Sequence, residues 1–562
     1  MAASLVAHWS QYPAAHDRLL SFIGIAVHWS ILQYVLGLPF LAFIAYLIYL
    51  KTGAEKWRKL SRTLVKGFII VFAVGAATGT ASEFGLVLLW PNLTQAAGRY
   101  IYFPLYAEVF AFMMEVVFIY MLWYGWNKFG KKALAIVMLF ALIGPWFSAA
   151  MIVSVNSYMV APTGIEPAYN PQTGQWLYNE HYPKLMLVVP MKYVQLLNVS
   201  LLQSVGMQVV KPVTVNGEKA VVVYMPVTIV QRLAYESWHG YTVKDSILHV
   251  VLKPEYQNNT AVLNTPVMKI VDDILTTTIK YVGVMSVAFK SPVYRASILH
   301  VMGSAITVSS FTVMAAYAMR KLKKHGKGNK EYEEYVETAF RYAAAMALIF
   351  ITIQGLVFGH MMGRDIATYN PEKFAAIEGQ TNYAFSIDKT FHLDKLMAFI
   401  AYGSTSAKLP NYDAIPNDYC ACKLTEQQDM ARIGTCKPPI IIHYIYYTKI
   451  SLAILVGLYA LLIHYYLIIR KKDVPAWALK LALPAAVVIM MVSWMGWAVR
   501  EIGRKPWTIY GIMTPDVAHT FNPAPTWAVA AVALFFIAVL LALAYSVWKF
   551  LYLPGKQVAV EG

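Results

Sequence analysis

Charged residues are scarce in this sequence. Asp, Glu, Lys and Arg together make up 14% of the 562 residues, whereas a soluble protein carries about 25%. Hydrophobic residues make up 58%. They gather in several runs of about 20, a length that crosses the roughly 30 Å hydrocarbon layer of a bilayer. This composition excludes an ordinary soluble globular protein and predicts an all-α polytopic membrane protein.

Cysteine is rarer still, with three residues in the chain, at positions 420, 422 and 436. Because all three fall in one loop that we expect to lie outside the cytoplasm, one disulfide with one thiol left over is the first interpretation. A metal site with three cysteine ligands is the alternative, although the spacing fits no standard motif. The segment before the first apolar run also lacks the basic start and apolar core of a cleaved signal peptide.

We expect nine transmembrane helices, at residues 19–50, 64–90, 101–126, 132–160, 293–320, 338–362, 439–469, 475–500 and 525–553. Short loops rich in Lys and Arg follow the first, third, fifth and seventh spans, so these loops share one side if the spans alternate. The positive-inside rule makes that side cytoplasmic, the N-terminus external and the C-terminus cytoplasmic. The net charge of +17 then reflects topology, and nucleic-acid binding is the less favoured interpretation.

Two long segments separate the spans on the outer side. Residues 161–292 contain "QVVKPVTVNGEKAVVVYMPV", whose Asn-Gly pair between apolar runs is typical of a β-hairpin, and "TPVMKIVDDILTTTIKYVGVM", which predicts a helix. We therefore expect a small α+β external insertion. The chain then divides into spans 1–4 at 1–160, the insertion at 161–292, spans 5–6 at 293–362, an external loop at 363–438 and spans 7–9 at 439–562.

Four side chains that can bind iron fall at a similar depth. His28, Glu108, His300 and Glu501 all lie in the outer half of the membrane in this topology. Imidazole and carboxylate both suit iron, and a helical bundle can hold a haem between its helices. Each side chain also has a plainer interpretation, as a hydrogen-bonded core histidine or a packed ion pair. The pattern alone does not distinguish haem from a proton relay or a transporter site.

Six separated motifs resemble the large, haem-bearing subunit I of cytochrome bd-type quinol oxidases. They occur in the family's order: "DRLLSFIGIAVHWSI", "GAATGTASEFG", "PLYAEVFAFMMEVVF", "SILHVMGSAITVSSF", "NPEKFAAIEGQ" and "REIGRKPW". The 161–292 segment is outside the resemblance, because the family usually has a short connection there. The resemblance implies a terminal oxidase of the prokaryotic plasma membrane. Such an enzyme oxidises quinol at the outer face and reduces O2 to water at a di-haem site with cytoplasmic protons.

The resemblance also assigns the haem ligands. His28, ten residues after Arg18, would ligate one haem of the oxygen-reducing pair, and Glu501 would ligate the other. Glu108 would lie at the iron of the oxygen-binding haem. His300 would ligate the low-spin haem that receives electrons from quinol.

Two further residues near the end of the eighth span would support the haems. Arg504 would balance Glu501 and the haem propionates, because a planar guanidinium pairs with carboxylates bidentately. Trp497, one turn before Glu501, would pack against a macrocycle.

The resemblance further implies a quinol site in the external loop. Lys373 and Glu378, five residues apart, match the family's quinol-site Lys and Glu, and a carboxylate there can take the quinol proton. The plainer interpretation of this pair is an exposed ion pair.

Protons for oxygen reduction would follow a path through Glu115, Ser148 and Asn156. Glu108 and Glu115 lie seven residues apart, which places them on one helix face about 10 Å apart along the axis. The family usually spaces these two acids by eight residues. Either the helix lacks a local bulge here or the inner acid points in another direction.

By the same resemblance the cofactors would be two haems b and, at the oxygen site, haem d or a third haem b. A homologous second membrane subunit, with or without a small single-span subunit, would complete the enzyme. Two alternatives remain open: a non-catalytic sister subunit, and an ion-coupled transporter that uses its buried carboxylates.

The seventh span departs from the family pattern. The family has a Met there as second axial ligand of the low-spin haem, but this span contains no Met, and Ile450 stands at the expected position. Three outcomes are open: His300 as the only axial ligand, a deprotonated Lys449 as ligand, or His443 after a register shift. Lys449 pairing with a propionate is the plainer alternative.

Overall fold

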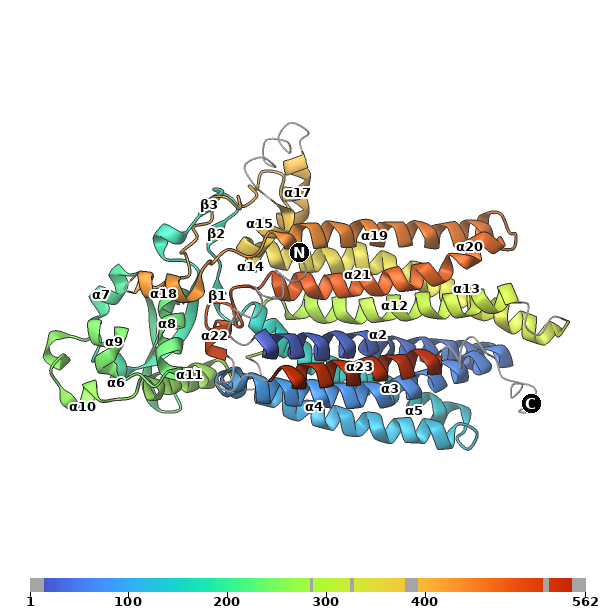
Figure 1. Ribbon diagram of the computed structural model, residues 1–562, viewed down its shortest axis with the longest axis horizontal. Helices are drawn as coiled ribbons and strands as arrows, with labels where there is room; N and C mark the ends of the chain where they lie inside the picture. Colours follow the sequence, from blue (N-terminus) through green and yellow to red (C-terminus); the bar gives the residue numbers. More distant parts are fainter. Residues whose placement is uncertain are drawn as a thin grey trace.

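The computed structural model describes residues 15–283, 287–323, 328–379, 393–423, 425–518 and 525–547. Long helices lie side by side in one bundle, and a smaller domain with a sheet sits at one end of it (Figure 1). The bundle consists of α2 (Ala15–Thr52), α3 (Glu55–Leu89), α4 (Pro91–Gly125), α5 (Lys131–Val160), α12 (Tyr294–Lys323), α13 (Lys330–Ile353), α14 (His360–Tyr369), α19 (Ile441–His464), α20 (Ala476–Lys480), α21 (Ala482–Ile502) and α23 (Thr526–Val547).

Eight spans in the described part of the chain are long and apolar enough to cross a bilayer. A π-helical turn at Gln354–Gly359 joins α13 to α14 within one of them, and a second at Tyr465–Ile469 extends α19. The shorter apolar stretch Thr526–Ala542 lies in α23, and residues 548–553 of the predicted ninth span fall outside the described residues. The all-α membrane fold is confirmed, while the count of nine stays a prediction.

Helix α3 begins at Glu55, inside the basic stretch that we expected to be a loop. Gly53 has φ +69°, a left-handed conformation that favours glycine, so the chain reverses within the short segment between α2 and α3. Leu60 and Leu64 are buried on one face of the first turns of α3. Because one side of this basic segment packs against the bundle, it continues the helix instead of forming a loop.

The bundle helices are closely packed at small residues. A Cβ on Gly37 of α2 would overlap the side chain of Ser309 and the carbonyl oxygen of Ala305, both on α12. The Ser309 hydroxyl donates to the Gln33 carbonyl oxygen across the same contact (3.0 Å). Small residues allow helix backbones to approach in this way within membranes.

The smaller domain is built around a four-stranded antiparallel sheet with the order β1-β4-β6-β5. Its strands are β1 (Ile165–Glu166), β4 (Lys184–Pro190), β5 (Gln208–Val215) and β6 (Glu218–Pro226), with a separate pair β2 (Tyr169–Asn170) and β3 (Gln175–Trp176). Strands β5 and β6 form the hairpin that the Asn-Gly pair predicts, since Asn216 and Gly217 both have positive φ.

Several helices accompany the sheet. They are α6 (Met191–Val194), α7 (Val199–Ser204), α8 (Val227–Trp238), α9 (Ile247–Val250), α10 (Thr260–Leu263) and α11 (Val267–Val282), with short 3₁₀ turns at Tyr178–Glu180, Val243–Asp245 and Pro254–Tyr256. Helix α11 is the one predicted from "TPVMKIVDDILTTTIKYVGVM". It contacts β4 through a bond from the Val188 N–H to the Thr278 hydroxyl (2.8 Å).

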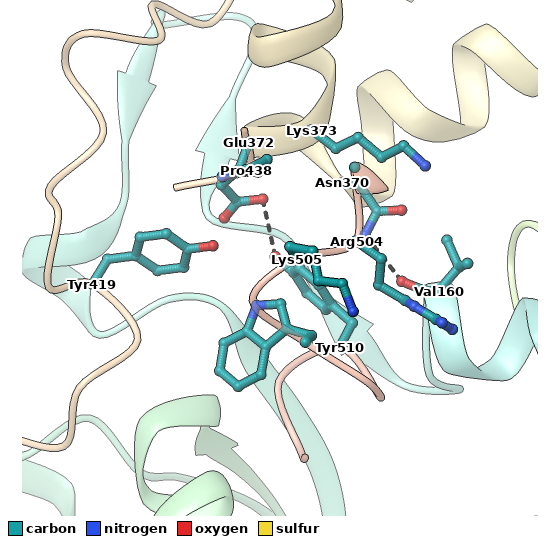
Figure 2. Close-up of a pocket in the computed structure, with 11 residues that line it drawn as sticks. Val160, Asn370, Glu372, Lys373, Tyr419, Pro438, Arg504, Lys505 and Tyr510 are labelled. Carbon is teal, nitrogen blue, oxygen red and sulfur yellow. Dashed lines mark hydrogen bonds between the residues drawn. The ribbon is translucent and has the colours of Figure 1, made fainter. Parts of the chain in front are cut away.

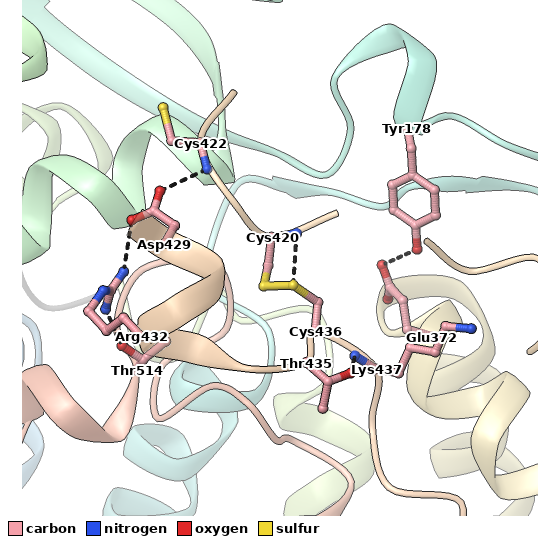
Figure 3. Close-up of a disulfide and its surroundings, with 10 residues drawn as sticks. All are labelled: Tyr178, Glu372, Cys420, Cys422, Asp429, Arg432, Thr435, Cys436, Lys437 and Thr514. Carbon is pink, nitrogen blue, oxygen red and sulfur yellow. Dashed lines mark hydrogen bonds and ion pairs between the residues drawn. A yellow bond between two sulfur atoms is a disulfide. The ribbon is translucent and has the colours of Figure 1, made fainter. Parts of the chain in front are cut away.

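The second long segment packs between this domain and the bundle. It contains α15 (Pro371–Glu378), α17 (Leu393–Tyr402) and α18 (Glu426–Ile433), and α22 (Pro515–Ala518) lies near α18 (Figure 1). Cys420 and Cys436 form a disulfide, and Cys422 is a buried thiol outside it (Figure 3). The described residues hold no cluster of three or more His, Cys, Asp or Glu side chains suited to a metal ion, so the disulfide interpretation of the cysteines is the one found.

A buried ionic network ties three parts of the chain together. Arg232 of α8 donates to Asp429 of α18 (3.1 Å), and Arg432 of α18 donates to Asp516 of α22 (2.8 Å). Asp429 also accepts from the Cys422 N–H (3.0 Å), as Figure 3 shows. Removing one partner of a buried ion pair costs about 3–5 kcal/mol. The network therefore holds the disulfide loop and the segment after α21 against α8.

Candidate functional site

His28 is oriented by two residues of α3. Its Nδ1 is hydrogen-bonded to Thr78 Oγ1 (3.1 Å), and Thr78 donates its hydroxyl proton to the backbone carbonyls of Val74 and Gly75. Because the Thr78 proton is used in this way, its oxygen accepts the hydrogen bond from His28 Nδ1–H. The other ring nitrogen, Nε2, then carries the free lone pair that can bind a metal. A Cβ on Gly79 would lie 3.0 Å from His28 Cε1, so glycine at this position leaves room for the ring.

Glu108 and Glu115 both project from α4 toward α5. Ser148 of α5 donates to Glu108 Oε1 (2.9 Å), while Glu108 Oε2 is buried with no hydrogen-bond partner among the described residues. Glu83 of α3 lies within interaction range of Glu108. Glu115 is 5% exposed, and a Cβ on Gly144 of α5 would lie 2.6 Å from its Cγ. The two acids therefore face the same neighbouring helix, one deeper than the other.

Glu501 has a charged or amide partner on each oxygen. Arg504 donates to Oε2 (2.5 Å) and Asn156 donates to Oε1 (3.0 Å). The Oδ1 atom of Asn156 accepts from Arg500, which also donates to the Ser297 hydroxyl (3.0 Å). Asn156 therefore contacts Glu501 and Arg500, whereas the sequence prediction placed it on a path near Glu108 and Glu115.

Trp497 connects this cluster to the His28 helix. Its ring stacks on Trp29 with a centroid distance of 5.0 Å, and the Trp29 indole donates to Ser493 Oγ (3.0 Å). Ser493 in turn contacts Ser304 (3.2 Å), which donates to Gln33 (3.1 Å). This polar chain between α2, α12 and α21 was not predicted, because serine and glutamine in a span carry no distinctive sequence signal.

His300 of α12 and Lys449 of α19 belong to neighbouring parts of the site. Lys449 lies close enough to the His300 ring for an electrostatic interaction, and its amino group sits 4.7 Å from the centre of the Tyr446 ring. The Nδ1 atom of His300 is buried without a hydrogen-bond partner in the described structure. His443, by contrast, is hydrogen-bonded through Nδ1 to the Ile377 carbonyl oxygen (2.9 Å).

Lys373 is buried at the end of α21. It is 4% exposed, and its amino group donates to the Arg500 carbonyl oxygen (3.1 Å). A Cβ on Gly503 would lie 2.7 Å from Lys373 Cε, so glycine at that position makes space for the side chain. Burial, reinforced by Arg500, lowers the pKa of Lys373 to about 7. This burial rules out the interpretation of Lys373 as half of an exposed ion pair.

Glu378, at the other end of α15, accepts a hydrogen bond from Tyr447 of α19 (2.5 Å). Arg18, predicted from the first motif, lies within electrostatic reach of Lys505. Figure 2 shows Lys373, Arg504 and Lys505 around one pocket at the boundary between the bundle and the smaller domain. Lys373 is therefore in direct contact with the "REIGRKPW" segment, whereas the contact found for Glu378 is with α19.

The residues present fit haem. Buried polar atoms without partners are rare in folded proteins, yet several occur at the predicted haem sites within the described residues: His300 Nδ1, Glu108 Oε2, and Nε and Nη1 of Arg504. Imidazole and carboxylate are iron ligands, and guanidinium groups pair with propionates. A ligand that carries both a metal and carboxylates suits this donor set.

Three residues with functional potential were not predicted in these roles. Glu83 beside Glu108 lies in the motif "GAATGTASEFG", and Arg500 begins the motif "REIGRKPW", but neither residue was assigned a role from the sequence. Glu372 of α15, next to Lys373, is 1% exposed and was not singled out. A buried carboxyl cannot be told from a solvated one by its sequence neighbours, so only the structure identifies it.

Comparison with solved structures gives the same fold. The structure of bd oxidase from Geobacillus thermodenitrificans matches with a TM-score of 0.64 at 20% identity, covering 97% of this chain and 99% of that one. A provisionally named cytochrome bd menaquinol oxidase subunit I of Bacillus subtilis (strain 168) is 20% identical over 509 residues, which is 86% of this chain and 84% of that protein.

A shorter match has higher identity. The cytochrome bd-II ubiquinol oxidase subunit 1 of Escherichia coli (strain K12) is 33% identical over 138 residues, 24% of this chain and 27% of that protein. The family model for cytochrome bd terminal oxidase subunit I matches residues 17–204 and 260–557. Between these two stretches it omits 205–259, so 161–204 and 260–292 do fall inside the match, which corrects the expectation that all of 161–292 lies outside the resemblance. The chain therefore belongs to the cytochrome bd terminal oxidase subunit I family.

Proposed function

We propose that this chain is the subunit of a membrane-bound terminal oxidase that oxidises quinol at the outer face and reduces O2 to water. The observation that carries the proposal is the contact between Lys373 and the Arg500 carbonyl oxygen (3.1 Å). This contact joins the loop that we assign to quinol to the helix end that carries Glu501. The quinol site, which donates electrons, and the haem site at Glu501, which accepts them, would then be in contact.

The proposed haem ligands are His28, Glu108 and Glu501 at the oxygen site and His300 at the low-spin site. Haem supplies one-electron transfer and oxygen reduction when bound. The chain itself orients the ligand side chains and balances their charge. Thr78 fixes the His28 ring, and Arg504 balances the Glu501 carboxylate.

The chain would also deliver protons from the cytoplasmic side. Glu115 is the deeper acid of α4, and Glu108 is held by Ser148 nearer the outer face. A carboxyl group can take up and hold a proton, and the Ser148 hydroxyl, which both donates and accepts hydrogen bonds, can orient that proton or pass it on. Asn156 has a different part in this proposal, because its partners are Glu501 and Arg500.

The experiment that tests the function is a spectrum of the purified protein in its membrane complex, before and after reduction by dithionite. We expect haem bands and quinol-dependent O2 consumption. Reduced haem d and haem b absorb differently, so the same spectrum identifies the group at the oxygen site. A transporter would give no haem bands, and a non-catalytic sister subunit would give no quinol-dependent O2 consumption from the sites assigned here.

A first prediction concerns the external loop. Lys373→Ala or Glu378→Ala should raise the quinol KM or lower kcat, because each removes a polar group from the proposed quinol site. Reduction of the haems by dithionite should not change, since that reagent bypasses the site. Lys395→Ala, at an exposed lysine of α17, is the matched control. Unchanged quinol kinetics in both test variants would contradict the assignment.

We also propose a homologous second membrane subunit as partner, with or without a small single-span subunit. Helix α4 carries a row of exposed large apolar side chains: Tyr106, Val109, Phe110, Met113 and Val117. Such a face suits lipid or another transmembrane helix. Purification of the chain from its native membrane, with identification of the proteins that co-purify, shows whether this face is covered by lipid or by another subunit.

A further inference from the structure

Glu372 is a buried carboxyl without an ion pair in the described structure. It is 1% exposed. Tyr178 donates to its Oε1 (3.2 Å) and Tyr510 donates to its Oε2 (3.0 Å), contacts that appear in Figures 3 and 2 respectively. A buried carboxylate normally has a cation beside it. Here two phenols from distant parts of the chain stabilise its charged form instead.

The surroundings of Glu372 form one pocket with Lys373. The cavity has a volume of about 10 Å³ and is also lined by Asn370, Arg504 and Lys505. The Oδ1 atom of Asn370 is buried there without a hydrogen-bond partner in the described structure. This volume is about that of a single water-sized probe, and Asn370 Oδ1 and the Glu372 carboxylate are both able to accept a hydrogen bond from a water there. A water in the pocket can therefore link Glu372 to a neighbouring group.

We propose that Glu372 accepts a proton that quinol releases beside Lys373, and that Tyr178 and Tyr510 hold its carboxylate ready for that transfer. The inference rests on the proposed function, in which Lys373 borders the quinol site. Oxidation of one quinol to quinone releases two protons and two electrons. The electrons pass to oxygen by the proposed activity. One quinol O–H bond breaks as the O–H bond of the Glu372 acid forms, directly or through the pocket water. The proton of the second quinol O–H bond leaves to the aqueous phase at the outer face.

The electrostatic setting supports this role. Burial raises the pKa of Glu372 to about 7, against hydrogen bonds from Tyr510 and Tyr178 that lower it. The groups that face it are the phenols of Tyr178, Tyr419 and Tyr510, together with Lys373, Arg504 and Lys505 around the pocket. A proton acceptor works best when its pKa lies near the operating pH.

A purely structural role is the competing explanation, because Glu372 joins α15, the 178 turn and the segment after α21. The variant Glu372→Gln distinguishes a proton-accepting role from a structural one. The amide keeps the size of the side chain and an oxygen that accepts a phenolic hydrogen, but it cannot take a proton. We expect kcat for a short-tail quinol to fall at least about 10-fold at pH 7, with KM within about 2-fold and an unchanged dithionite-reduced spectrum. Glu372→Asp should recover part of the rate.

The pH profile gives a readout that packing does not move. The carboxylate is the active form, so kcat should rise with pH through the Glu372 pKa, and this acidic limb should vanish in Glu372→Gln. Tyr178→Phe removes a donor to the charged form, which raises the Glu372 pKa and shifts the acidic limb to higher pH. Glu180→Gln, an exposed acid on the same short turn as Tyr178, is the matched control and should keep the wild-type profile.

The wild-type rate with quinol, measured alongside, tests the proposed function separately. Wild-type turnover with an unaltered kcat and acidic limb in Glu372→Gln would overturn the inference and leave the proposed function intact. If Glu372→Gln does not assemble, Tyr178→Phe decides: an acidic limb at higher pH supports the inference, and an unmoved limb overturns it.

Discussion

Replacing Glu108 by Gln is expected to reduce O2 consumption by at least about 100-fold, the lower range for loss of a positioned acid or base. The amide keeps the size of the side chain and can still accept from Ser148, whose hydroxyl lies 2.9 Å from Oε1. What it loses is a group that can carry a proton at the predicted oxygen-binding haem. The expected defect is therefore chemical and not structural.

Two measurements distinguish a chemical defect from a structural one in Glu108→Gln. The dithionite-reduced spectrum of Glu108→Gln should retain its haem bands, and quinol should still reduce the haems without oxygen. Ser148→Ala is a graded comparison, because it removes only the hydrogen bond to the acid and should slow turnover much less. Glu83→Gln tests the third acid of the group, which lies within interaction range of Glu108.

Glu115→Gln should slow turnover and leave all haems bound. Glu115 is buried beside Gly144 on the adjacent helix, where a proton coming from the cytoplasmic side would pass before it reaches Glu108. Full activity in both Glu108→Gln and Glu115→Gln would contradict the proton-path assignment, because no other acid of α4 lies between them.

The sequence predicts the long helices well, because the membrane leaves the chain little choice. Buried backbone groups in lipid must be satisfied within the segment, so each apolar run of sufficient length becomes a helix. The Asn216–Gly217 hairpin is predictable for a similar reason, since two residues of positive φ strongly favour that turn. Helix ends are less predictable. The basic start of α3 is helical only because one of its faces packs on the bundle.

The site is predictable only in part. The motif resemblance identifies His28, Glu501 and Lys373 as candidates, but it gives no partner for any of them. Asn156 sits one helix away from Glu108 and was assigned to its path, yet the rotation of α5 turns it to Glu501. Glu372 depends on Tyr178 and Tyr510, which lie 194 and 138 residues away in the sequence. Contacts of that range follow from the tertiary fold and not from local pattern.

The second large effect is expected at Lys449. Helix α19 contains no Met, so the ligand that the family uses on this span is absent, and Ile450 at the expected position cannot bind iron. Lys449 lies within electrostatic reach of His300 and near Gly496 of α21. His443 is less available, because its Nδ1 is bonded to the Ile377 carbonyl oxygen and a Cβ on Gly379 would overlap its ring. Between the two, the geometry favours Lys449.

We therefore expect Lys449→Ala to remove the low-spin signal of the haem assigned to His300, while His443→Ala leaves it unchanged. The measurement is the absorption or electron paramagnetic resonance spectrum, which reports coordination independently of turnover. Lys449→Arg separates the two roles of the lysine, because arginine keeps the positive charge but stays protonated and cannot ligate iron. Recovery of the low-spin spectrum in Lys449→Arg would mean that Lys449 pairs with a propionate. A six-coordinate low-spin spectrum in both alanine variants would place the second ligand elsewhere in the chain.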